Sequence, residues 1–105
     1  MIVARIVSAR DAAQLVNDEA AVLLDVREPD EWLALRAPGA LHIPMQQLAT
    51  SLDRLRQDRT IACICHVGIR SAAVADALTN AGYDAVNIDG GMEAWEAAGL
   101  PVEQG

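Results

Sequence analysis

The sequence predicts an α/β fold in which helices cover both faces of a parallel sheet, and two observations carry this prediction. Continuous apolar runs at residues 21–26 and 60–65 are typical of strands that are buried on both sides. These runs alternate with segments of helical character, as right-handed crossovers between parallel strands require. Because the chain has 105 residues and 52% of them are hydrophobic, we expect one domain spanning residues 1–105.

The first elements each have a local signal. A short strand is expected at residues 4–7, and a helix then begins at Ser8, because Asp11 stands three residues on at capping-box spacing. Residues 21–26 are expected to form a buried strand that ends in a charge, Asp25. Residues 28–35 begin with proline and acidic residues, which suit the first turn of a helix.

The second half of the chain continues the alternation. Within the helix expected at residues 71–82, Val74, Ala77, Leu78 and Ala81 share one face, and Gly82 stands at the C-terminal stop. The expected elements are, in order, a turn and short strand at 37–44, a helical stretch at 46–56, a strand at 60–65, the helix at 71–82, a strand at 85–89 and a helix at 91–99.

Composition limits the partners and the compartment. The net charge is −7, from 15 acidic residues against 8 arginines, which argues against nucleic acid and against an anionic membrane surface. The apolar runs are strand-length, and the N-terminal run is too short for a signal peptide, so we expect no membrane span and no export. Cys63 and Cys65 are too close on one strand to form a disulfide. Reduced thiols are typical of the cytoplasm, where we expect the protein.

The stretch CHVGIRS, from Cys65 to Ser71, predicts a reactive cysteine. Cys65 ends a strand, as does Asp25, and ligands gather at the carboxyl ends of parallel strands; Asp89 is expected at the same rim. The loop offers backbone N–H groups, a glycine that permits positive φ, and Arg70 just before a helix that Ser71 is expected to open. All of these features stabilise a thiolate.

Other interpretations of the cysteines are weaker. A lone free cysteine is usually a core residue, but the glycine, arginine and helix start that follow Cys65 favour a nucleophile. Cys63 lacks these neighbours and is expected to fill the core. His42, Cys63, Cys65 and His66 match no tetrahedral ligand spacing, so we expect no metal, and the chemistry requires no cofactor.

Four motifs in order resemble the rhodanese family of sulfurtransferases: LLDVREPDEW, PGALHIP, CHVGIRS and IDGGMEAWEAAGLPV. The resemblance covers nearly the whole chain. It implies a single rhodanese-like domain with a five-stranded parallel sheet. It also implies that Cys65 carries sulfane sulfur as a persulfide, within a substrate loop of His66, Val67, Gly68, Ile69, Arg70 and Ser71.

The supporting residues leave alternatives open. By resemblance, Asp25 and Arg27 form a structural pair that braces the loop; otherwise Asp25 caps the next turn and Arg27 faces water. His66 either hydrogen-bonds an oxyanion or is an exposed loop residue. One departure is clear, because the family has Gly-His-Ile where this chain has Leu35-Arg36-Ala37. We expect Arg36 to be solvated.

Two other function classes compete with the sulfurtransferase. Cysteine-dependent phosphatases and arsenate reductases place five residues between cysteine and arginine, whereas this chain has four, a ring better suited to one sulfur than to a phosphoryl group. A silent binding module normally lacks the cysteine. We therefore expect transfer from a small sulfur-containing anion such as thiosulfate to cyanide or a thiol. The sequence does not say whether a sulfur-relay protein or a low-molecular-weight thiol is the partner.

Overall fold

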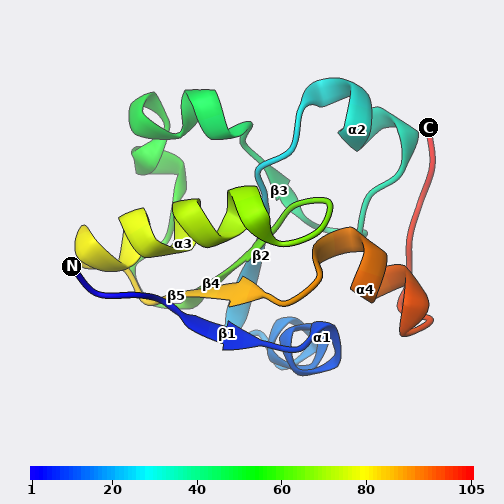
Figure 1. Cartoon of the computed structure of the whole chain (residues 1–105), viewed down its shortest axis with the longest axis horizontal. Coiled ribbons are helices and arrows are strands. Elements are labelled where there is room, and N and C mark those ends of the chain that lie inside the picture. The colour runs from blue at the N-terminus through cyan, green and yellow to red at the C-terminus, as the bar shows by residue number, and fades with distance from the viewer.

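The computed structural model describes all 105 residues and contains one five-stranded sheet (Figure 1). The strand order is β1-β5-β4-β2-β3, and every neighbouring pair is parallel, which confirms the predicted α/β fold. The elements are β1 (Arg5–Val7), α1 (Ala9–Asn17), β2 (Ala21–Asp25), α2 (Pro29–Ala34), β3 (Leu41–His42), the 3₁₀ helices η1 (Met45–Thr50) and η2 (Leu52–Arg54), β4 (Thr60–Ile64), α3 (Ile69–Asn80), β5 (Ala85–Ile88) and α4 (Gly91–Ala97).

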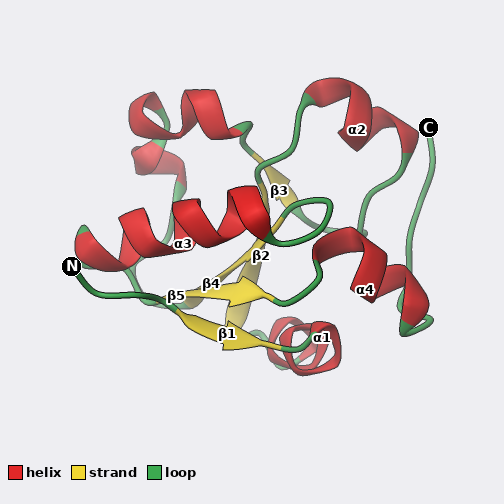
Figure 2. Ribbon diagram, viewed as in Figure 1, coloured by secondary structure: helices red, strands yellow, loops and turns green.

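Helices cover both faces of the sheet, as Figure 2 shows, with α3 and the 3₁₀ helices on one side and α1 and α4 on the other. Each face has its own apolar cluster. Leu24, Leu48, Cys63 and Leu78 belong to the cluster under α3, and the cluster under α1 and α4 includes Trp95. This burial explains why the strands are apolar on both sides. The longest helix has 12 residues, and none of the helices is suited to cross a bilayer.

The register brings the ends of the central strands together. Asp25 on β2 lies opposite Ile64 on β4, and Cys63 on β4 lies opposite Asn87 on β5. Cys65 follows β4 directly, so its side chain lies at the carboxyl end of the sheet between β2 and β5. The expected position of Cys65 at this rim is therefore confirmed.

Two helical predictions differ from the structure in detail. The segment expected to be one helix at 46–56 is two 3₁₀ helices, because Ser51 between them has a non-helical φ of −124°. The buried face of α3 consists of Ser71, Val74, Ala75 and Leu78, whereas Ala77 and Ala81 of the predicted face are exposed. The helix turns Ala75 toward the sheet, and Ala77 and Ala81 border a surface groove instead.

Candidate active site

Three donors converge on the Sγ atom of Cys65. The backbone N–H of Gly68 lies 3.1 Å from the sulfur, the N–H of Ser71 lies at 3.4 Å, and the Ser71 hydroxyl oxygen lies at 3.2 Å. Gly68 is the N-cap residue of α3 and Ser71 lies in its first turn, so the backbone N–H groups of both residues have no partner within the helix. The cysteine sulfur therefore serves as the N-terminal cap of α3, and the positive end of the helix points at it.

The loop reaches this geometry through Gly68. Its φ is +100°, a left-handed conformation that favours glycine, and it lets α3 begin at Ile69. Space is also limited, since a Cβ at this position would lie 3.3 Å from the backbone nitrogen of Gly90 and 3.5 Å from the carbonyl oxygen of Ile88. The prediction that Ser71 opens the helix was wrong by two residues, because Gly68 completes the turn before Ser71 is reached.

The start of α4 holds the other side of the loop. The backbone N–H of Met92 donates to the carbonyl of Cys65 at 2.7 Å, and that of Glu93 donates to the carbonyl of His66 at 3.1 Å. Gly91 makes this approach possible, since a Cβ there would collide with both carbonyl groups. With these carbonyls turned toward α4, the N–H groups further along the loop face Sγ.

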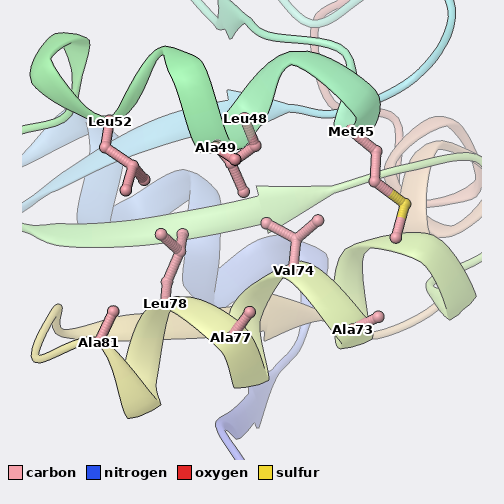
Figure 3. A pocket seen from close by; sticks show the side chains of 9 residues that line it. All are labelled: Met45, Leu48, Ala49, Leu52, Ala73, Val74, Ala77, Leu78 and Ala81. Atoms are coloured by element: carbon pink, nitrogen blue, oxygen red, sulfur yellow. The ribbon is translucent and has the colours of Figure 1, made fainter.

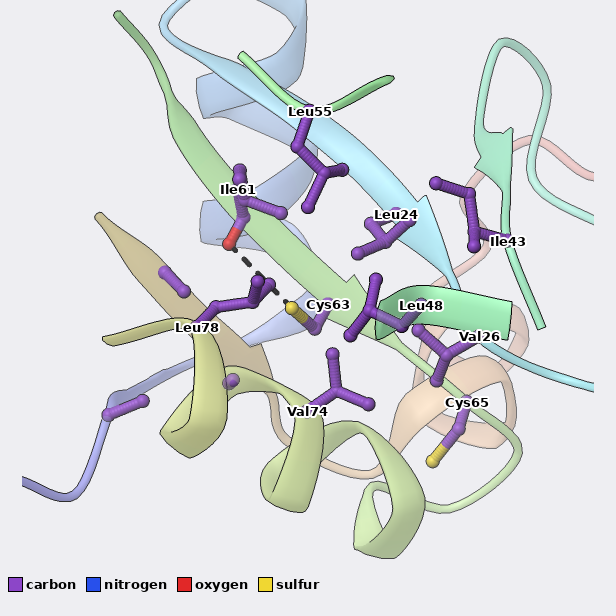
Figure 4. Packing of buried hydrophobic residues seen from close by; sticks show 13 residues of the cluster. Leu24, Val26, Ile43, Leu48, Leu55, Ile61, Cys63, Cys65, Val74 and Leu78 are labelled. Atoms are coloured by element: carbon purple, nitrogen blue, oxygen red, sulfur yellow. Dashed lines mark hydrogen bonds between the residues drawn. The ribbon is translucent and has the colours of Figure 1, made fainter. Parts of the chain in front are cut away.

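The two cysteines have opposite acidities. Burial would raise the pKa of Cys65, but the hydrogen bonds from the Ser71 side chain and from the backbone N–H groups of Ser71, Gly68 and Val67 outweigh burial and lower it. Burial raises the pKa of Cys63 to about 12, helped by the neighbouring Cys65. In Figure 4, Cys63 points into the core between Leu78 and Val74. The expectation that Cys63 fills the core is confirmed.

Arg70 is committed to a carboxylate. Its two terminal nitrogens donate to the two oxygens of Glu31 at 2.7 and 2.8 Å, in a bidentate pair that joins α3 to α2. The hydrogen bonds from Arg70 lower the pKa of Glu31 to about 2 against the effect of burial, and Glu31 in turn raises the pKa of Arg70. Arg70 donates no hydrogen bond to Sγ. Its charge is largely balanced by the carboxylate of Glu31.

Asp25 and Arg27 form a buried ion pair at the end of β2. The guanidinium contacts both carboxylate oxygens, and the backbone N–H of Arg27 donates to Asp25 at 3.0 Å, so Asp25 also caps its own turn. Arg27 is 4% exposed and therefore does not face water. The remaining hydrogen bonds of the guanidinium go to the carbonyls of Glu31 and Leu35, so the pair braces the α2 segment, whose Glu31 binds Arg70 of the cysteine loop.

The other rim residues lie apart from the sulfur. His66 is exposed, and its Nε2 lies 3.2 Å from a carboxylate oxygen of Glu93. The side chains of Val67 and Ile69 are also exposed, so these residues contribute backbone to the loop and apolar surface around it. Asp89 directly follows β5 but lines a depression with Ser8, Ala9, Arg10, Ala94 and Ala98 rather than the Cys65 loop.

The expectation that Arg36 is solvated was wrong. Its side chain is 18% exposed, pairs with Glu103 at 3.1 Å and donates to the carbonyl of Trp32 at 3.2 Å. The guanidinium also lies over the Trp32 ring, at 5.3 Å from its centroid. The Trp32 ring also stacks on the ring of His42, with centroids 4.6 Å apart. Arg36 therefore ties the α2 region to the C-terminal segment.

Sequence analysis missed two residues of the site. Glu31 binds Arg70, and Asn87 accepts a hydrogen bond from the Ser71 hydroxyl at 2.7 Å while donating to the carbonyl of Gly68 at 3.1 Å. Both are far from the loop in sequence. The signal for Asn87 was a polar residue inside an otherwise apolar strand, which requires a partner when buried.

No metal-binding cluster adjoins the site, and the largest groove of the molecule lies elsewhere. The structure has no group of three histidine, cysteine or acidic side chains placed to hold a metal ion. The largest groove, about 320 Å³, lies between the 3₁₀ helices and α3 and includes no residue of 65–71 (Figure 3). Its lining is entirely apolar: Met45, Leu48, Ala49, Leu52, Ala73, Val74, Ala77, Leu78 and Ala81.

Comparison with known proteins agrees with this architecture. The family model for the rhodanese-like domain matches residues 8–98, which include every strand of the sheet except the edge strand β1. The chain belongs to the rhodanese-like domain family.

Relatives of this rhodanese-like domain carry names from sulfur chemistry. The thiosulfate sulfurtransferase GlpE of Actinobacillus succinogenes is 39% identical over 93 residues, which cover 88% of this chain and 84% of that protein. GlpE of Vibrio cholerae is 34% identical, covering 89% and 90%. Among solved structures, a rhodanese-related protein from Thermoplasma volcanium superimposes with a TM-score of 0.88 at 33% identity, covering 96% of this chain and 99% of that one.

Proposed function

We propose that this rhodanese-like domain is a thiosulfate sulfurtransferase that carries sulfur on Cys65. The observation that carries the proposal is the convergence of the Gly68 N–H, the Ser71 N–H and the Ser71 hydroxyl on one sulfur atom. Donors in this arrangement stabilise the thiolate, which is the nucleophilic form of cysteine. The relatives named as thiosulfate sulfurtransferases support the same activity.

The reaction has two balanced steps. The Cys65 thiolate attacks the outer sulfur of thiosulfate, the S–S bond of the donor breaks, and its electron pair leaves with sulfite. A nucleophilic acceptor, cyanide or a thiolate, then attacks the terminal sulfur of the Cys65 persulfide. The bond between Sγ and the terminal sulfur then breaks, and its electron pair returns to Sγ. No metal or redox cofactor enters either step. Both cysteines are unpaired, which suits a reducing compartment such as the cytoplasm.

The competing functions have less support. The loop has four residues between Cys65 and Arg70, one fewer than cysteine-dependent phosphatases and arsenate reductases have, so it suits a single sulfur better than a phosphoryl group. A silent binding module gives no reason for three donors to surround a cysteine sulfur. The acceptor is a nucleophile that attacks the terminal sulfur, and either a small thiol or a relay protein would complete the second step.

Mass spectrometry of the protein after incubation with thiosulfate tests the proposal. We expect one added sulfur atom on the peptide that contains Cys65, and we expect its loss on addition of cyanide. Cys63→Ala is the matched control and should still gain the sulfur, whereas Cys65→Ser should not. Steady-state kinetics should give parallel double-reciprocal lines, since the enzyme is covalently modified between the two substrates. Sulfur transfer by folded Cys65→Ser would overturn the assignment.

A further inference from the structure

The hydroxyl group of Ser71 has one proton and two acceptors. Its oxygen lies 3.2 Å from Sγ of Cys65 and 2.7 Å from Oδ1 of Asn87. A serine hydroxyl donates one hydrogen bond at a time, so it cannot serve both acceptors at once. All three residues are buried, and no side-chain polar atom in this region lacks a partner. The orientation of this one proton therefore distinguishes two states of the site.

The amide of Asn87 cannot rotate to resolve the conflict. Its Nδ2 donates to the carbonyl oxygen of Gly68 at 3.1 Å. A rotated amide would place Oδ1 against that carbonyl, bringing two acceptors together with no proton between them. Oδ1 therefore stays directed at Ser71 as a fixed second acceptor. Asn87 itself makes no hydrogen bond to Cys65.

The charge on Sγ decides which acceptor is stronger. A hydrogen bond to an ionised acceptor is about twice as strong as a neutral one, so a thiolate should take the Ser71 proton. The sulfur of a neutral thiol, or the inner sulfur of a persulfide, is a weak acceptor, and the Asn87 carbonyl oxygen is then preferred. The other two donors to Sγ are backbone N–H groups fixed at the start of α3. The hydroxyl is the donor that can turn away.

We propose that Asn87 is a positioning residue that holds the Ser71 hydroxyl proton while the Cys65 sulfur is neutral and releases it to Sγ when the sulfur becomes a thiolate. The persulfide part of this cycle rests on the proposed function. When an acceptor attacks the terminal sulfur, the S–S bond breaks and its electron pair returns to Sγ. The Ser71 hydroxyl then rotates from Oδ1 to Sγ. The proton stays on the Ser71 oxygen throughout.

Several charged or titratable groups surround this cluster, and none of them donates a hydrogen bond to Sγ. Those groups are Arg70 on α3 with Glu31 on α2, Asp25 and Arg27 at the end of β2, His66 with Glu93 on α4, and the Cys63 thiol on β4. The carboxylates are each paired with a cation or a histidine. Among the titratable groups of this region, Cys65 is therefore the one in direct contact with the Ser71 hydroxyl.

Nuclear magnetic resonance of the intact protein tests the proposal. The side-chain amide signal of Asn87 should move with pH, with the same midpoint as alkylation of Cys65 by iodoacetamide. In Ser71→Ala that movement should fall to less than about half, because only the field of the thiolate remains. The side-chain amide of Asn80, which is exposed and bound to the Ile2 carbonyl, serves as an internal reference. Equal movement in the wild type and in Ser71→Ala would overturn the proposal.

A double-mutant cycle gives an independent test. Asn87→Ala removes both the Gly68 contact and the competing acceptor, whereas in a Ser71→Ala background it removes the Gly68 contact alone. If the two substitutions acted independently, Asn87→Ala would shift the alkylation pKa of Cys65 equally in both backgrounds. We expect the pKa in Asn87→Ala to lie about half a unit or more below that additive value. Additive shifts would contradict the proposal. The titration uses the unmodified thiol, so it is informative whether or not a persulfide forms. A thermal melt of each variant checks folding.

Discussion

Cys63 and Cys65 are two residues apart at the end of one strand, yet only one of them is activated. The two side chains are equally buried, at 0% and 1% exposure, and belong to the same apolar cluster. The sulfur of Cys63 has only a weak contact, 4.0 Å from the Ile61 carbonyl, whereas the sulfur of Cys65 faces three donors. Burial alone therefore does not decide which cysteine is reactive, because it raises the pKa of a thiol only where no donors offset it. The direction of the backbone N–H groups in the following loop decides it.

The largest expected effect is the difference in alkylation between the two cysteines. The pKa of Cys63 is raised to about 12 and that of Cys65 is lowered, so near pH 8 the thiolate fraction of Cys65 should far exceed that of Cys63. Peptide mapping after a short iodoacetamide pulse measures both sites in one sample. Similar labelling of Cys63 and Cys65 in the folded protein would break the comparison.

Gly91→Ala should disturb Cys65 while leaving Cys63 in place. Gly91 has a φ of +55°, and its Cβ would meet the His66 carbonyl carbon at 2.7 Å, so α4 must move away from the loop. We expect a loss of about 3 kcal/mol in unfolding free energy and a strong loss of sulfur transfer. Gly99→Ala is the matched control, with a φ of +73° but open space around it. It should cost about 1 kcal/mol and leave transfer unchanged.

Cys63→Ala tests the other half of the comparison. The substitution removes a buried sulfur from the core under α3, which should cost about 1–2 kcal/mol of stability. Sulfur transfer should stay close to that of the wild type, because Cys63 lacks the donors. Urea denaturation and the cyanide assay measure the two properties. A loss of activity as deep as that of Cys65→Ser, in a folded protein, would make Cys63 a relaying thiol.

The Arg70–Glu31 pair should make stability depend on acid pH. The pKa of Glu31 is lowered from 4.5 to about 2, so the pair stabilises the fold above about pH 4.5, and this contribution is lost as the pH falls toward 2. We expect about 1 kcal/mol, since the pair is partly exposed. The difference in urea midpoint between the wild type and Glu31→Gln should be smaller at pH 3 than at pH 7. A constant difference at both pH values would contradict this expectation.

The smallest expected effect is that of Arg70 on the Cys65 thiolate. Because the donors to Sγ are backbone N–H groups and the Ser71 hydroxyl, Arg70→Ala should shift the alkylation pKa by less than about one unit. The damage should appear instead in thiosulfate saturation. Arg70→Ala combined with Glu31→Gln controls for the carboxylate left unpaired. A larger upward shift in both variants would make Arg70 the main activator.

The sequence predicted the order of the elements and the position of Cys65 because these depend on local patterns. Apolar runs mark the buried strands, and the rule for parallel sheets places Cys65 at the rim. The capping of the first helix is equally local, and the structure confirms that the Ser8 hydroxyl accepts from the backbone N–H of Asp11 at 3.0 Å.

The remaining features of the site depend on contacts between distant segments. Glu31 meets Arg70 across 39 positions, and Asn87 meets Ser71 across 16. Arg36 looked like a surface residue because its ion-pair partner, Glu103, is far from it in sequence and meets it only through the C-terminal segment. The start of α3 was misplaced because Gly68 is its N-cap residue and the sulfur of Cys65, rather than a serine or aspartate side chain, accepts from the N–H groups at the start of the helix.

The packing of Gly91 against the loop has a consequence for protein engineering. The segment from Cys65 to Ser71 is not a self-contained cassette, because the carbonyls of Cys65 and His66 are held by the start of α4. Transplanting the seven residues into another parallel sheet would leave those carbonyls free to turn inward and face the sulfur. A functional graft has to include the Gly90–Gly91 turn from the adjacent strand, so the smallest transferable unit comprises two neighbouring strand ends.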